Sequence, residues 1–233
     1  MTIGPIRRPH IGVLVPSALA WLLLSGSAIP GLPDFCGPAG HSAAATIAGM
    51  TIALRLNPIG PLLLSWLLML CAMMLPLLGK PIAEVNALGG SRLRGALAVM
   101  AFLTSYTAVW IAVLSLLTAA TAGLRLVTMA APLIALGIAI AWQATPIKAR
   151  CLRLCRDATI SWPARAPELR GLGHGVAAAR ACAGSGWALM ALPFLFETGH
   201  FAVMAAATVV MAWESLGPAQ DRGSFGLHRV ALG

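Results

Sequence analysis

Long apolar runs separated by short, mostly basic connectors make up most of the chain. A helix needs about 20 apolar residues to cross the hydrocarbon core of a bilayer, and six runs approach or reach that length. A weaker run at 43–56 contains two threonines and suggests a short helix lying on the membrane surface. The pattern predicts an all-α, polytopic helix bundle that forms one integral membrane domain over residues 1–233. The predicted spans cover residues 11–29, 59–78, 97–119, 126–142, 176–196 and 201–213.

The basic residues of the connectors fall on one side of these predicted spans. If the N-terminus is cytoplasmic, the outer segments contain only Arg55 and Arg125, and nearly all other Lys and Arg residues lie inside. Lys and Arg are enriched in the cytoplasmic loops of membrane proteins, so we expect both termini in the cytoplasm. The first span, which follows Arg7 and Arg8, also resembles a signal peptide, but its length favours a retained helix.

Composition supports the same interpretation. The 233 residues are 59% hydrophobic and 10% charged, with a mean hydropathy of +0.85, whereas soluble domains carry about 25% charged residues. A soluble fold of this size could not bury so much apolar surface, so the lipid bilayer is the expected partner. The net charge of +9 is scattered between apolar spans and lacks a basic domain, so we predict no nucleic-acid binding.

Cysteine is the first candidate for chemistry. The chain contains Cys36, Cys71, Cys151, Cys155 and Cys182, and an odd, scattered set indicates reduced thiols or metal ligands rather than a disulfide framework. In a helix, Cys151 and Cys155 would lie on one side, and the neighbouring arginines would favour their thiolate forms. A closed tetrahedral site needs four ligands, and His174 and Cys182 are candidates to complete one. The alternative is two free thiols beside an ordinary basic loop.

Methionine supplies a second set of soft ligands. Met69 and Met73 in the second span are four residues apart and share one helix face. Thioether and thiolate sulfur select Cu(I) over hard cations, so copper is the metal that these residues suggest. The alternative is that these methionines are adaptable packing residues. No nucleotide-binding, metalloprotease or hydrolase motif is present, so we predict no catalytic residues and favour a protein that is not an enzyme.

Several motifs resemble one known family. The second span contains Trp66, Met69, Ala72, Met73, Met74 and Pro76 in a pattern similar to the signature of the DUF2182 family, predicted metal-binding integral membrane proteins. The resemblance continues in the same order to Glu214. Its further residues are Tyr106, Trp110, Thr145, Pro146, Lys148, Cys151, Cys155, Cys182, Gly184, Trp187, Met190, Met204 and Glu214.

The chain departs from this family pattern at two places. Relatives often have a Cys-Cys pair just before the tryptophan, where this chain has Ser185 and Gly186, and a lysine where it has Ser215. If that pair holds metal in relatives, two ligands are lost here. The resemblance implies a multi-pass protein of the bacterial inner (plasma) membrane with suspected metal binding, and it implies no reaction.

These observations leave three hypotheses. The leading one is a metal-associated membrane protein that handles copper or another soft transition metal. The alternative is a non-catalytic accessory subunit packed in a larger membrane complex, which the small residues of the last two spans favour. A transporter or redox enzyme is disfavoured, because proton-coupled proteins usually carry acids or histidines within the membrane and this chain has few.

Overall fold

The structure is a computed structural model that describes residues 11–25, 59–156, 166–196 and 199–216. Within these ranges every regular element is a helix, which confirms the all-α prediction, and each of the six predicted spans overlaps a helix. The predicted surface helix at 43–56 and Cys36 lie outside the described residues. In chain order the elements are α1 (Ile11–Ser25), α3 (Ile59–Met73), η3 (Leu75–Leu78), α4 (Gly79–Ala87), α5 (Arg92–Val127), α6 (Ala131–Gln143), α7 (Pro146–Arg156), α8 (Pro167–Ala191), η4 (Leu192–Phe194) and α9 (His200–Leu216).

One described helix, α5, is by itself long and apolar enough to cross a membrane. Two bent helix pairs, Leu63–Met73 with Leu75–Ala87 and Ala131–Gln143 with Pro146–Cys155, raise the number of candidate spans to three if each pair counts as one. Many large apolar side chains on the described helices are exposed, including Leu116, Leu133 and Ile140. These features are compatible with membrane association, while six crossings go beyond what helix length and apolarity establish.

Helix α5 is longer than the predicted third span. It begins at Arg92, where the Ser91 side chain accepts a hydrogen bond from the Arg94 backbone N–H, and it continues to Val127. At about 1.5 Å per residue its 36 residues extend roughly 54 Å, well beyond a hydrocarbon core of about 30 Å. The predicted fourth span therefore begins later than expected, at Ala131, after a break that contains Thr128.

Proline explains the bend that follows α3. Pro76 has no N–H to donate to the carbonyl of Ala72, four residues earlier, so a continuous helix would leave that carbonyl without its usual partner. In the structure the Ala72 carbonyl accepts hydrogen bonds from Ser17 Oγ (2.9 Å) and Trp21 Nε1 (3.0 Å) of α1. The chain bends by 56° between α3 and the η3–α4 segment. A neighbouring helix thus replaces the hydrogen bond that proline removes.

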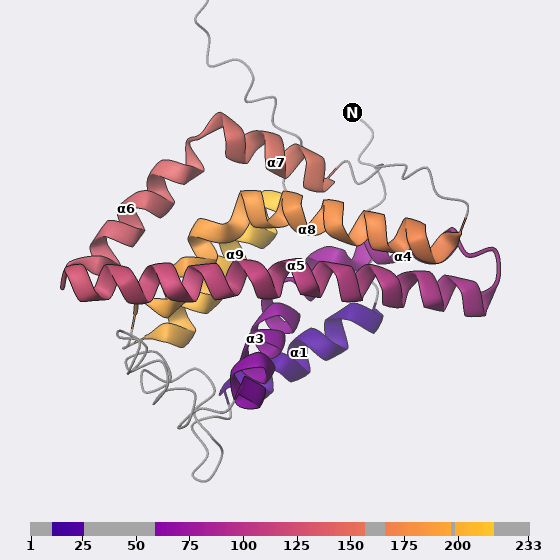
Figure 1. Ribbon diagram of the computed structural model, residues 1–233, viewed down its shortest axis with the longest axis horizontal. Coiled ribbons are helices and arrows are strands. Elements are labelled where there is room, and N and C mark those ends of the chain that lie inside the picture. The colour runs from indigo at the N-terminus through magenta and orange to yellow at the C-terminus, as the bar shows by residue number, and fades with distance from the viewer. Residues whose placement is uncertain (1–10, 26–58, 157–165, 197–198, 217–233) are drawn as a thin grey trace, which may run out of the picture.

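Helices α5 and α8 form the centre of the fold and run side by side in the same direction (Figure 1). Glycine permits this contact, because a Cβ at Gly171 would collide with the Ala98 carbonyl and one at Gly175 with the Phe102 carbonyl. Ser105 Oγ adds hydrogen bonds to the carbonyls of Phe102 and Leu172, both at 3.0 Å. Small residues just before the fifth predicted span, in the first part of α8 (Pro167–Ala191), therefore serve close helix packing.

Candidate metal centre

A sharp turn brings α7 back over α8. The chain bends by 69° between α6 and α7 at Pro146, and the Thr145 hydroxyl donates to the Trp142 carbonyl that Pro146 cannot reach (2.9 Å). Figure 1 shows α7 lying along α8. The two helices run in opposite directions, because Cys151 contacts the Gly184 region and Cys155 contacts Cys182. The segment that carries the predicted cysteine pair is therefore helical, as the ligand hypothesis required.

One face of α7 points into the protein. Lys148, Cys151 and Cys155 are spaced three and four residues apart, so they share that face. Lys148 is 3% exposed, and both cysteines are half-buried. Arg150 and Arg153 are exposed on the outer surface of the helix. These two arginines therefore lie on the exposed side of α7, whereas the two cysteines lie on its buried side.

Two thiols meet where α7 packs on α8 and a third lies one turn away on α7, and we call Cys155, Cys182 and Cys151 the thiol cluster. The Sγ atoms of Cys155 and Cys182 are 2.9 Å apart. Cys151 Sγ packs against Gly184 and lies 2.5 Å from the position that a Cβ on that glycine would take. None of these three cysteines, nor Cys71, is in a disulfide. The structure thus brings together Cys155 and Cys182, which the sequence separates by 27 positions.

The thiol cluster contains ligands that suit a soft metal, but its sulfurs are not spaced as they would be around a bound metal ion. Within the described residues, no group of three or more His, Cys, Asp or Glu side chains is arranged to hold a metal ion. Sulfurs that share a metal through bonds of about 2.3 Å lie about 3.8 Å apart in a tetrahedral arrangement. The 2.9 Å pair would therefore have to open by about 1 Å, a displacement that a shift of α7 can supply.

Aromatic side chains enclose the thiol cluster. Trp142 Nε1 donates to the Gly184 carbonyl (3.1 Å), and its ring meets that of Trp187 edge-on with centroids 5.2 Å apart. From α5, the Tyr106 hydroxyl lies beside the Cys182 thiol, although it has no hydrogen-bond partner of standard geometry. These rings keep the inner side of the cluster away from water.

A buried ion pair fastens α7 to α9. Lys148 Nζ lies 2.5 Å from Glu214 Oε1, and the two side chains are 4% and 22% exposed. Lys148 precedes Cys151 and Cys155 by one and two helical turns, so this contact ties the helix that carries both thiols to α9. The predicted site residues Lys148 and Glu214 are thus brought together in the structure.

His174, another predicted ligand, lies apart from the thiol cluster. It precedes Cys182 by eight residues of the same helix, about 12 Å along its axis. Met69 and Met73 are buried in the same hydrophobic core as Cys182. Their role as metal ligands stays a prediction. Met74, Met190, Trp66 and Trp187 are buried or half-buried, and Pro76 produces the bend after α3.

Sequence reasoning did not assign a role to three residues of the centre. Tyr106 and Gly184 belong to the family-like motifs, but only the fold shows that they contact Cys182 and Cys151. Trp142 had no sequence feature that linked it to the cysteines, because its hydrogen bond to Gly184 spans 42 positions. The sequence therefore indicates which residues share one helix face, but it does not indicate which residues contact each other between helices.

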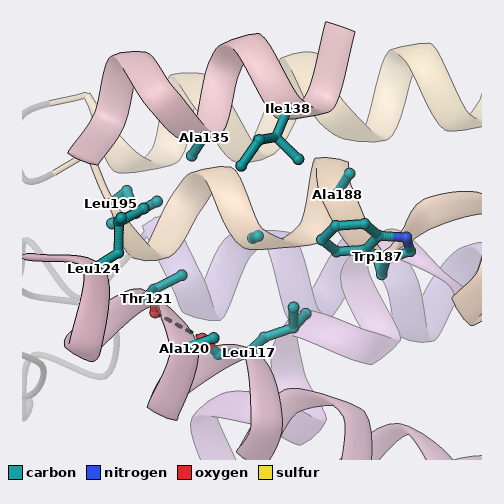
Figure 2. A pocket seen from close by; sticks show the side chains of 10 residues that line it. Leu117, Ala120, Thr121, Leu124, Ala135, Ile138, Trp187, Ala188 and Leu195 are labelled. Carbon is teal, nitrogen blue, oxygen red and sulfur yellow. Dashed lines mark hydrogen bonds between the residues drawn. The ribbon is translucent and has the colours of Figure 1, made fainter. Parts of the chain in front are cut away.

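A separate cavity lies behind Trp187, between α5, α6 and α8 (Figure 2). It measures about 110 Å³, and its lining is apolar except for Thr121. The Thr121 hydroxyl donates to the Leu117 carbonyl within α5 (2.8 Å). The residues that line this cavity therefore offer no soft metal ligand.

The fold and its centre define a helical protein whose buried cysteines suit a soft metal. A family model described as PpoB2, copper chaperone, matches residues 63–229, so the chain belongs to this copper chaperone family. DUF2182 is another name for the same family. The matched range includes the thiol cluster and the Lys148–Glu214 pair, and it supports a copper-related role. No curated protein and no solved structure matches the chain.

Proposed function

We propose that this protein is a membrane-embedded copper chaperone that carries Cu(I) on the thiolates of the thiol cluster. The observation that carries the proposal is the 2.9 Å approach of Cys155 on α7 to Cys182 on α8. Thiolate is a ligand that selects Cu(I) over hard cations. Membership of the copper chaperone family supports copper as the cargo.

The two helices have different parts in this proposal. Cys182 is 6% exposed on α8, which packs tightly on α5, so it is a fixed ligand. Cys151 and Cys155 are half-buried on α7, which makes them the ligands that meet incoming copper first. Loading requires each thiol to release its proton, since metals bind the thiolate.

Delivery follows from the same arrangement. A thiol of an acceptor protein can approach the half-buried cysteines of α7 and displace them from Cu(I) one at a time. Copper then leaves as Cu(I), with no change in oxidation state, and each displaced thiolate takes up a proton. We propose that Lys148 and Glu214 act as positioning residues, because their ion pair holds α7 near α8 between loading and release.

We further propose a multi-pass arrangement in the plasma membrane, with six spans and both termini in the cytoplasm. The exposed apolar side chains of the described helices and the basic inner connectors support it. Single cysteines introduced by Arg94→Cys and Arg153→Cys into a chain lacking its own cysteines test the topology. Both should resist a membrane-impermeant maleimide in intact cells and react after lysis, whereas reaction of one before lysis would contradict the arrangement.

Copper binding by the purified chain tests the proposed function. The full protein is purified in detergent under reducing conditions, and bound copper, zinc and iron are measured after Cu(I) competition with a chromogenic chelator. We expect stoichiometric copper in the wild type and its loss in Cys155→Ser/Cys182→Ser. Cys71→Ser is the matched control, because it removes a half-buried thiol outside the thiol cluster.

Two results would contradict the proposal. One is a wild-type protein that binds no copper but co-purifies with another membrane protein, which would instead favour the accessory-subunit hypothesis. The other is copper that persists in Cys155→Ser/Cys182→Ser and disappears in the control.

A further inference from the structure

The ends of two methionine side chains, the sulfur of Met211 and the terminal methyl group of Met74, approach α8 one helical turn beyond Cys182. Gly186 is buried, and a Cβ at this position would lie 3.2 Å from Met211 Sδ of α9 and 3.8 Å from Met74 Cε. Met74 and Met211 are 2% and 6% exposed. The two side chains come from segments more than a hundred residues apart, and both reach the gap that the missing side chain of Gly186 leaves.

This gap lies on the same face of α8 as Cys182. Cys182, Gly186 and Met190 follow one another at intervals of four residues, and all three are buried. One interval corresponds to about 6 Å along the helix. The Met211 sulfur therefore approaches α8 about one helical turn from Cys182.

Resting on the proposed function, we propose that Met74 and Met211 form a second Cu(I) site, the thioether site, next to Gly186. Thioethers are soft and suit Cu(I), and they bind it without releasing a proton. Transfer from the thiol cluster is a ligand exchange. Cu(I)–thiolate bonds break as Cu(I)–thioether bonds form, the released thiolate takes up a proton, and no electron is transferred.

The glycine is required for this site. Because Gly186 has no side chain, the flexible ends of Met74 and Met211 can meet against the backbone of α8. Methionine is also a common packing residue in irregular gaps, and leucine can usually replace it in a core at a cost below about 1.5 kcal/mol. Methionine-to-leucine variants therefore remove the thioether while preserving most of the packing, and they separate metal binding from core filling.

X-ray absorption at the copper edge tests the proposal. The full chain is produced with selenomethionine, purified in detergent under reducing conditions and loaded with excess Cu(I). We expect copper–selenium scattering in the wild type, and its loss together with one bound copper equivalent in Met74→Leu/Met211→Leu. Met204→Leu removes a buried methionine that no contact places at Gly186, and it should keep both signals. Met69→Leu/Met73→Leu removes the other methionine pair that the sequence suggests as ligands. The single variant Met211→Leu is measured in parallel, in case the double variant does not fold.

The outcomes separate this proposal from the proposed function. If bound copper shows scattering from sulfur and none from selenium, and this copper is lost in Cys155→Ser/Cys182→Ser, the thioether site is overturned. The thiol-based chaperone would then remain. Selenium scattering that survives Met74→Leu/Met211→Leu but disappears in Met69→Leu/Met73→Leu would also overturn it. Selenium scattering unaffected by the cysteine substitutions, with no cysteine-bound copper, would support the thioether site and contradict the thiol cluster.

Discussion

The Lys148–Glu214 ion pair allows a quantitative test of how α7 is held in place. In Glu214→Leu the carboxylate is removed, and the Lys148 ammonium remains in a position where its side chain is 4% exposed. A buried charge without its partner typically costs about 3–5 kcal/mol. Lysine can lower that cost by extending its chain toward water, and we expect this extension to move α7 away from α9.

We therefore expect a free-energy cost near the lower end of that range, about 3 kcal/mol. This cost should favour a state in which α7 is released from α9. Since each 1.4 kcal/mol corresponds to about a tenfold change in an equilibrium constant, the released population should rise by about a hundredfold. In Lys148→Met/Glu214→Leu both charges are absent. Replacing a buried ion pair by apolar residues of similar size is often neutral or stabilising, so this double variant should hold α7 about as well as the wild type.

Thiol accessibility reports the released state. The rate at which Cys155 reacts with a maleimide, followed by mass spectrometry of its peptide in detergent-purified protein, should be much faster in Glu214→Leu than in the wild type. The double variant should react at nearly the wild-type rate. Equal rates in the wild type and Glu214→Leu would refute the role of the ion pair. A double variant as reactive as the single one would show that the carboxylate acts through another contact.

Three further predictions concern packing between helices. Gly175→Ala introduces a methyl group where the α5 backbone leaves no room, so thermal unfolding in detergent should show a loss of about 1–3 kcal/mol. Gly123→Ala faces open space and should instead be neutral or stabilising by up to about 1 kcal/mol. Gly184→Ala should push Cys151 and α7 outward, so Cu(I) affinity measured by chelator competition should fall while the fold persists; unchanged affinity would contradict the contact. Arg125→Met removes the guanidinium that donates to the Phe194 and Leu195 carbonyls at 3.1 and 2.9 Å, and should cost about 1.5–3 kcal/mol; a melting temperature equal to that of Gly123→Ala would exclude this contribution.

The distribution of apolar residues was sufficient to predict a helical protein with exposed apolar surface. Each of the predicted spans overlaps a helix within the described residues, because long apolar runs in short-looped chains leave few alternatives to helices. The ends were less predictable. Helix α5 extends through basic residues at its start and past Arg125 at its end, since its polar ends are stabilised by contacts that hydropathy does not represent.

The candidate centre shows the same division. The sequence by itself placed Cys151 and Cys155 on one helix face and named Cys182 as a further ligand, because spacing within a helix follows from its geometry. Only the tertiary structure decided that α7 folds back so that Cys155 meets Cys182, that Lys148 pairs with Glu214, and that His174 lies elsewhere. Such contacts depend on where proline bends the chain and where glycine lets two helices approach, and these effects act between segments far apart in sequence.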